Sequence, residues 1–141
     1  MKTITDHNSL IDFYKSCNLE FPDTGYVGKP LFSIIYGEPD EIVGALTVTT
    51  QNEDIIIDDI AVEEQYRKKG IGKALIKRAI EMIKRMKLTH AVYAITKEPS
   101  FFHHMGFHRI ERSEAPDFSI CFNCEQFQVN CFPVPMKMII D

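Results

Sequence analysis

The sequence predicts a single-domain α/β fold in which helices flank a mixed sheet. Three observations support this expectation. A length of 141 residues suits one domain with its own core. Hydrophobic residues make up 45% of the chain and charged residues 26%, which is typical of a globular protein. Apolar segments with strand character and segments of helical periodicity follow one another, and no repeat or linker interrupts them.

The N-terminal segment "MKTITDHNSLIDFYKSCNLEF" is polar and helix-like. It lacks the continuous apolar stretch and the small-residue cleavage site of a signal peptide. No apolar run in the chain approaches the length that spans a bilayer. We therefore expect a cytoplasmic protein without a membrane partner, whose four cysteines are mostly reduced thiols.

The first half of the chain is expected to form one helix and three strands. Residues 8–20 carry apolar residues at helical spacing, and Ser9 is the candidate N-cap. Residues 31–51 read as a hairpin whose two apolar strands flank the turn residues 37–40. Residues 54–62, "DIIIDDIAV", are rich in isoleucine and predict a third strand.

The second half predicts a long helix, a strand, a short helix and two further strands. The long helix is expected over residues 70–86. Its predicted apolar face consists of Ile71, Leu75, Ala79, Met82, Ile83 and Met86. Residues 90–96 are strand-like, and residues 99–107 predict a short helix that begins with proline and ends near a glycine. Residues 108–113 and 136–141 are the last expected strands.

Charge is unevenly distributed along the chain. The formal net charge is −4, which argues against a general nucleic-acid binder. Residues 65–87 nevertheless carry nine Lys or Arg residues against one acid, Glu81. Such a segment in an acidic chain indicates a local anionic ligand. The lysines beyond position 75 are better explained as the solvated face of the helix.

The start of the long helix has the pattern of a phosphate site. Its sequence "RKKGIGK", residues 67–73, places two glycines where a strand leads into a helix. A helix N-terminus leaves backbone N–H groups without partners and carries partial positive charge. Glycines let an anion approach the backbone, and the neighbouring arginine and lysines strengthen the field. We therefore expect this turn to hold a phosphate-bearing ligand.

Two familiar phosphate-binding motifs do not fit this turn. The nucleotide-hydrolase loop requires a glycine where Arg67 stands and Ser or Thr where Ala74 stands. The dinucleotide fingerprint requires a third glycine, where the chain has Leu75. Residues 67–72 instead resemble the [RQ]-x-x-G-x-[GA] acetyl-CoA motif of the GNAT N-acetyltransferase superfamily. The preceding "IAV" strand, the amphipathic helix and "FFHHMGF" extend the resemblance over residues 40–111.

The resemblance implies a single GNAT domain over residues 1–141, with a mixed, mostly antiparallel sheet flanked by helices. It implies acetyl-CoA as co-substrate, with its pyrophosphate on the glycine turn and its pantetheine arm beside the preceding strand. The pyrophosphate residues are Arg67, Lys68, Lys69, Gly70, Gly72 and Lys73, and the pantetheine residues are Ile60, Ala61 and Val62. The sheet is expected to splay between residues 54–62 and 90–96, which makes room for the thioester.

Amine acetylation requires a base, because a primary amine is mostly protonated at neutral pH. Asp58 and Asp59 lie on the strand that leads into the turn, and either is a candidate. Strand alternation is expected to send them to opposite faces, so that only one meets the substrate. Asp58 is the preferred base, and a solvated or capping role is an alternative for either acid. A backbone amide within residues 60–62 is the expected oxyanion donor.

One position departs from the family pattern. Many members carry a tyrosine in the short helix that protonates the departing thiolate, whereas this chain has Phe101 and Phe102. Either no acid is needed, or another group supplies the proton. His103, His104 and Tyr93 are candidates, and a surface role is the alternative for the histidines.

The sequence gives weaker indications of the acceptor's chemical class and of the role of the C-terminal cysteines. Residues 95–107 resemble the amino-acid acetyltransferase branch of the N-acetylglutamate synthase type, which implies a small amine, such as an amino acid. Arg109 or Arg112 could then meet a carboxylate, or could simply be surface residues. A zinc site would combine Cys121, Cys124 and Cys131 with Cys17 or a histidine; buried or loop thiols are the preferred interpretation, and no metal is assigned.

Three functions are therefore weighed. The first is an acetyl-CoA-dependent N-acetyltransferase that acts on a small-molecule primary amine. In this function no nucleic-acid partner is expected, and a homodimer is one option for the oligomeric state. The second is a protein or peptide N-acetyltransferase. The third is a non-catalytic CoA- or metal-responsive regulatory module, for which the missing tyrosine and the cysteine tail are the main arguments.

Overall fold

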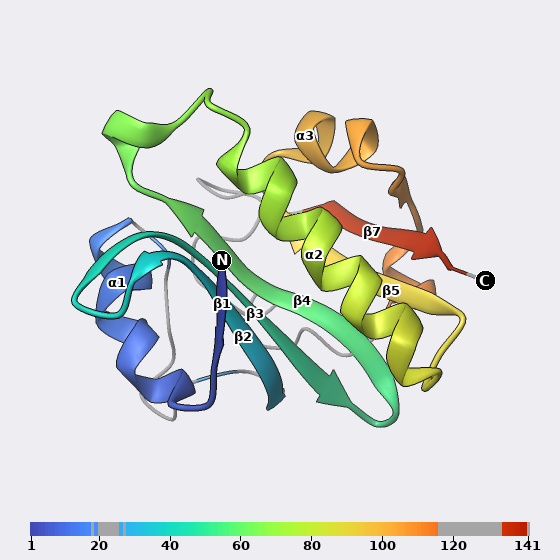
Figure 1. Cartoon of the computed structure of the whole chain (residues 1–141). Coiled ribbons are helices and arrows are strands. Elements are labelled where there is room, and N and C mark those ends of the chain that lie inside the picture. Colours follow the sequence, from blue (N-terminus) through green and yellow to red (C-terminus); the bar gives the residue numbers. More distant parts are fainter. Residues whose placement is uncertain (18, 20–25, 27, 116–133, 141) are drawn as a thin grey trace.

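A computed structural model describes residues 1–17, 19, 26, 28–115 and 134–140 of the chain (Figure 1). In this part of the chain seven strands form one sheet, in the order β1-β2-β3-β4-β5-β7-β6. The strands are β1 (Lys2–Ile4), β2 (Lys29–Glu38), β3 (Glu41–Gln51), β4 (Asp54–Val62), β5 (Ala91–Thr96), β6 (His108–Arg109) and β7 (Val134–Ile139). Only β4 and β5 run parallel, and the other neighbours pair antiparallel. The expected mixed, mostly antiparallel sheet is confirmed.

Three α-helices accompany the sheet in the described residues: α1 (Ile11–Ser16), α2 (Ile71–Met86) and α3 (Pro99–His104). Short 3₁₀ turns η1 (His7–Leu10), η2 (Glu64–Tyr66) and η3 (Arg112–Glu114) precede or follow them. Helix α2 crosses one face of the sheet, as Figure 1 shows. None of these helices combines the length and apolar character needed to cross a membrane.

The two faces of the sheet carry separate cores. On the α2 face, Leu46 and Val48 of β3 pack with Ile55 and Ile57 of β4 against α2 and α3. On the other face, a smaller core joins α1 to the strands, and its buried members are Leu10, Tyr14, Ile35, Ala45 and Ala61. Because successive strand residues alternate between faces, β3 residues 45, 47 and 49 face α1, and residues 46 and 48 face α2.

The hairpin, the third strand and the long helix follow the expectations closely. In the hairpin, Gly37 and Glu38 belong to β2 rather than to the turn, and Gly37 sits at a register shift with φ of +103°. The buried face of α2 contains Ile76 and Ile80 in addition to the predicted residues. Met86 is 38% exposed, contrary to the prediction, because it lies in the last turn before the helix ends at Lys87.

Several local expectations were wrong. The N-terminal segment begins with an edge strand, β1, which three residues are too short to reveal by periodicity. Asp6, not Ser9, caps the first turn: the Ser9 N–H donates to Asp6 Oδ1 at 3.3 Å, and the α-helix begins only at Ile11. The expected strand over residues 108–113 is only the two-residue β6, and a 3₁₀ turn at 112–114 with its own capping box replaces the rest.

Candidate active site

The glycine turn lies between the end of β4 and the start of α2. The backbone is left-handed at Lys68, with φ of +64°, and at Gly70, with φ of +82°. No side chain of the described residues caps the start of α2. A Cβ at Gly70 would meet no atom of the described part of the chain within 4 Å, so this position is open there to an approaching ligand. The turn therefore presents helix N-terminal amides beside an exposed, flexible backbone, which suits an anion.

Gly72 has a different environment. A Cβ built there would lie 3.3 Å from Cζ of Phe101 and 3.9 Å from a methyl of Val62. The absence of a side chain therefore lets the first turn of α2 pack closely against α3. This packing role was not evident from the motif, which suggests ligand approach for both glycines.

The basic residues of the turn differ in what they contact. Arg67 is exposed, and its Nε donates to the carbonyl of Val62 at 3.0 Å, which ties the turn to the end of β4. Lys69 Nζ lies 5.5 Å from the ring centroid of Tyr66. Lys68 and Lys73 are exposed beside the open turn. The arginine thus stabilises the turn, and the lysines supply most of the available positive charge.

The sheet separates beside this turn, as the family resemblance implies. The β4–β5 ladder consists of the pairs Ile55–Val92, Ile56–Tyr93 and Ile57–Ala94, and it stops there. Beyond it β4 stays paired with β3 as far as Val62, and β5 stays paired with β7 as far as Thr96. The edge of residues 58–62 that faces β5 has no ladder partner among the described residues. Ile60 and Val62 lie on the α2 face of this edge, and Ala61 lies on the α1 face.

The two candidate bases lie on the same face of β4, contrary to the expectation from alternation. Val48 pairs with Ile57 and Thr47 pairs with Asp59, so Asp58 is the extra residue of a β-bulge. The bulge shifts the alternation by one residue, and both carboxylates then lie on the α1 face. Asp58 is placed there by its hydrogen bond from Thr49, and Asp59 by its pairing with Thr47, since both threonines face α1.

The two acids differ in their partners. Oδ2 of Asp58 accepts hydrogen bonds from Thr49 Oγ1 at 2.9 Å and from the Gly28 N–H at 3.3 Å. Asp59 is 8% exposed, and its Oδ2 has no hydrogen-bond partner among the described residues. Burial raises the pKa of Asp58, and its hydrogen bonds oppose that rise. Burial raises the pKa of Asp59 well above its ordinary value, and the nearby charge and hydrogen bond of Asp58 raise it further.

A chain of hydroxyl groups lies beside the acids on the α1 face. His7 Nδ1 contacts Ser33 Oγ at 2.8 Å, Ser33 Oγ contacts Thr47 Oγ1 at 2.9 Å, and Thr47 Oγ1 contacts the Tyr14 hydroxyl at 2.8 Å. Burial raises the pKa of Tyr14, and the two aspartates add to the effect. The helical spacing within residues 8–20 indicated an apolar face and gave no sign of a role for the Tyr14 hydroxyl. Polar residues at alternate strand positions 47 and 49 were the available signal for this face.

A further tyrosine completes the same region. The Tyr26 hydroxyl donates to the carbonyl of His7 at 2.6 Å. Burial raises the pKa of Tyr26 to about 12, and the charges of Asp59 and Asp58 contribute to that rise. Both tyrosines near the acids are therefore neutral donors at neutral pH rather than bases.

The candidate acids for the thiolate lie elsewhere. Phe102 is buried in the α2-face core, with edge-on contacts to Phe101 and Phe107 at centroid distances of 5.5 and 5.2 Å. Phe102 therefore serves packing. His103 and His104 are exposed on α3. Tyr93 lies on β5 in contact with Ile56, and Lys137 Nζ lies 5.6 Å from its ring.

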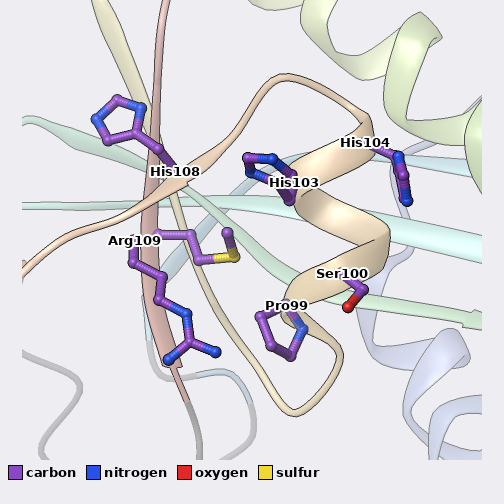
Figure 2. Close-up of a pocket in the computed structure, with 7 residues that line it drawn as sticks. Pro99, Ser100, His103, His104, His108 and Arg109 are labelled. Carbon is purple, nitrogen blue, oxygen red and sulfur yellow. The ribbon is translucent and has the colours of Figure 1, made fainter.

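A pocket of about 380 Å³ lies between α3 and the β6–β7 edge (Figure 2). Its lining consists of Pro99, Ser100, His103, His104, His108, Arg109 and Met136. Met136 belongs to the α2-face core and pairs with Arg109, so the pocket lies on the α2 side of the sheet. Figure 2 shows the Arg109 side chain directed away from His103, and His104 on the side of α3 away from Arg109. Arg109 is thus on the opposite face from the aspartates, and Arg112 is exposed in η3.

The expected zinc ligands cannot be placed. Cys121, Cys124 and Cys131 lie outside the described residues. Cys17 is a partly buried free thiol at the end of α1, and burial raises its pKa. Within the described ranges, no group of three or more His, Cys, Asp or Glu residues is arranged to hold a metal ion.

The glycine turn, the separated strands and the order of elements agree with one known family. The sequence model of the acetyltransferase (GNAT) domain matches residues 29–109. The chain belongs to this family. The matched GNAT segment runs from the start of β2 to the end of β6, and it contains the bulge, the gap and the turn.

Known relatives support this assignment. Streptothricin acetyltransferase A of Bacillus subtilis is 34% identical over 86 residues, which are 58% of this chain and 49% of the relative. An uncharacterized N-acetyltransferase of Chlorobaculum tepidum is 34% identical over 70 residues, which are 48% of this chain and 44% of the relative. The GNAT chain therefore spans about half the length of the curated relatives it matches.

A solved structure gives the same fold. N-acetylglutamate synthase from Neisseria gonorrhoeae, complexed with coenzyme A and N-acetyl-glutamate, has a TM-score of 0.74 at 14% identity. The similarity covers 99% of this chain and 35% of the synthase. Further GNAT structures with this fold also hold CoA or acetyl-CoA. At such identities these likenesses show the fold alone.

Proposed function

We propose that this protein is an acetyl-CoA-dependent N-acetyltransferase whose acceptor is the primary amine of a small molecule. The observation that carries the proposal is the order of three features along β4 and into α2. Two carboxylates, one buried and one partly buried, precede an unpaired strand edge, and that edge leads directly into an uncapped helix N-terminus with an open glycine. This order provides a base, a binding edge and an anion site within fifteen residues, 58–72.

In this proposal the turn binds the pyrophosphate of acetyl-CoA through its backbone amides and lysines. The residues concerned are Lys68, Lys69, Gly70, Gly72 and Lys73, with Arg67 keeping the turn in place. The free edge of Ile60, Ala61 and Val62 pairs with the pantetheine arm, whose amides can continue the missing ladder. A backbone amide of the same edge is the proposed oxyanion donor.

Asp58 or Asp59 accepts the proton that the amine must lose before it attacks the thioester. Their raised pKa values bring these carboxyls closer to the pKa of a useful base than an exposed aspartate. Solved relatives with bound CoA, and relatives named as acetyltransferases of streptothricin and of glutamate, support a small-molecule acceptor. One domain over residues 1–141, a cytoplasmic location and a homodimer remain predictions.

A protein N-terminus is the second candidate acceptor. The ribosomal-protein-S18-alanine N-acetyltransferase of Escherichia coli has a TM-score of 0.67 at 13% identity, covering 99% of this chain and 94% of that enzyme. A peptide acceptor is therefore included in the test.

The test combines ligand binding with turnover. Acetyl-CoA is expected to raise the melting temperature of the protein, and CoA thiol release is expected with small amines. Release only with peptides would favour the second candidate. Stabilisation by acetyl-CoA without thiol release from any amine or peptide would favour a regulatory module. Neither stabilisation nor release would refute the proposed function.

A further inference from the structure

The two carboxyl groups on the α1 face form one site. The bulge at Asp58 places both beside the point where the β4–β5 ladder ends. They are consecutive residues with both side chains on this face, so the two groups lie close together. A regular strand would have separated them across the sheet, so the bulge is the feature that creates the pair.

Among the described residues the pair has no ion-pair partner of opposite charge. Neither Asp58 nor Asp59 forms an ion pair with a Lys, Arg or His of the described residues. The Asp59 side chain is more than nine-tenths buried, and its Oδ2 accepts no hydrogen bond from the described residues. A buried carboxylate without a partner is unfavourable, and a cation with N–H donors would satisfy it. An alkylammonium supplies one positive charge and three such donors.

Arg109 and Lys137 are two cationic residues that could meet an acceptor carboxylate. Arg109, the expected carboxylate ligand, lies on the opposite face in the pocket of Figure 2. Lys137 is on the α1 face, since it pairs with Tyr93, and its Nζ lies 5.6 Å from the centroid of that ring. It forms no ion pair with Asp58 or Asp59.

We propose that the acceptor is a net-cationic alkyl amine, bound as an ammonium by Asp58 and Asp59 together, and not the α-amine of an amino acid. This inference rests on the proposed function and adds the chemical class of its acceptor. It departs from the amino-acid acceptor that the family branch suggests. An α-carboxylate at this site would lie against two acids that are themselves withdrawn from solvent, which is electrostatically unfavourable.

The reaction balances without any further reagent. The bound R–NH₃⁺ gives one proton to the aspartate pair, and the amine nitrogen then forms a bond with the thioester carbonyl carbon. The C–S bond breaks, and the departing thiolate takes the second proton as the amide forms. The pair returns its proton to solvent, so that the products are the acetamide, CoA thiol and one proton.

Matched acceptors test the inference directly. Pentylamine and norleucine differ only by the carboxylate on the reacting carbon. With acetyl-CoA present, kcat/KM from thiol release is expected to be at least about tenfold higher for pentylamine than for norleucine. Affinity for pentylamine and cadaverine in the presence of CoA is measured separately by calorimetry, because this readout does not need turnover.

Asp58→Asn and Asp59→Asn are each expected to weaken calorimetric binding of pentylamine about tenfold or more. Asp40→Asn, in the exposed β2–β3 turn, is the matched control and should leave binding unchanged. Equal or better use of norleucine, or no pentylamine or cadaverine binding to a protein that acetyl-CoA stabilises, would overturn this inference and leave CoA binding intact. Loss of acetyl-CoA stabilisation together with no turnover would instead refute the proposed function, and this inference with it.

Discussion

Asp59 should make the folded state less stable at neutral pH than an uncharged residue of the same shape would. Its side chain is buried, and Oδ2 lacks a hydrogen-bond donor among the described residues. An asparagine at this position has nearly the same shape, carries no charge, and can donate a hydrogen bond to the carboxylate of Asp58. We therefore expect Asp59→Asn to stabilise the ligand-free protein at pH 7.

The direction of the pH dependence follows from the raised pKa of Asp59. In the unfolded chain the carboxyl titrates near its ordinary pKa of 3.8. In the folded protein burial and Asp58 raise the pKa well above that value. Between these two pKa values the folded state holds a proton that the unfolded state has lost, so stability falls as pH rises through this window. Below pH 3.8 both states are protonated, and the effect disappears.

The expected gain at pH 7 is roughly 1–3 kcal/mol, the usual cost of a buried polar group without a partner. Each unit by which the folded pKa exceeds the unfolded pKa is equivalent to ~1.4 kcal/mol. Denaturant unfolding of the wild-type protein and Asp59→Asn at several pH values between about 3.5 and 8 measures the difference. Asp40→Asn, an exposed acid in the hairpin turn, is the control and should show no gain.

A gain that is the same at acid and neutral pH would show that charge is not the cause. A loss of stability at pH 7 would mean that Asp59 is ionised and satisfied in the folded state, which would refute the reasoning. The variant is also expected to lose amine turnover. A more stable and less active protein would indicate that the acid is kept for its chemistry at the expense of stability.

Substitutions at three further positions test other parts of the site. Gly70→Asp should abolish stabilisation by acetyl-CoA through charge repulsion, whereas Gly70→Ala, which shares the strain of φ at +82°, should retain most of it in the same thermal assay. Gly72→Ala should lower the free energy of unfolding by about 1 kcal/mol, because its Cβ would press on Phe101; unchanged stability would contradict the packing role. Tyr14→Phe should lower it by about 1 kcal/mol, measured by denaturant unfolding, through loss of the hydrogen bond to Thr47.

Periodicity predicted the parts of this fold where one face of an element is buried. The α2 helix and the β2–β3 hairpin show clear patterns, because each places apolar residues toward a single core. The strand residues 55–57 are buried on both faces, so they have no alternation that could reveal the bulge after them. The prediction that Asp58 and Asp59 lie on opposite faces was therefore wrong, although both residues were named as candidate bases.

The glycine turn could be identified because its chemistry is local. A helix start, two glycines and several cations lie within seven residues, 67–73. The hydroxyl chain on the α1 face could not be identified in this way. It joins η1, α1, β2 and β3, and its members come together only when the strands are in register. Distant pairing of this kind depends on tertiary packing, which a linear pattern does not contain.

The bulge itself can be removed by deleting one residue. Ile57 and Asp59 already pair with the adjacent β3 residues Val48 and Thr47, so deletion of Asp58 would give a regular ladder without moving residues 59–62 to the other face. We expect this variant to fold and to keep its stabilisation by acetyl-CoA, because the turn and the free edge remain. Amine turnover should fall at least as far as in Asp58→Asn, which removes the charge and keeps the bulge. Turnover close to that of the wild-type protein would show that Asp59 alone is sufficient and that the second carboxylate has no part in the reaction.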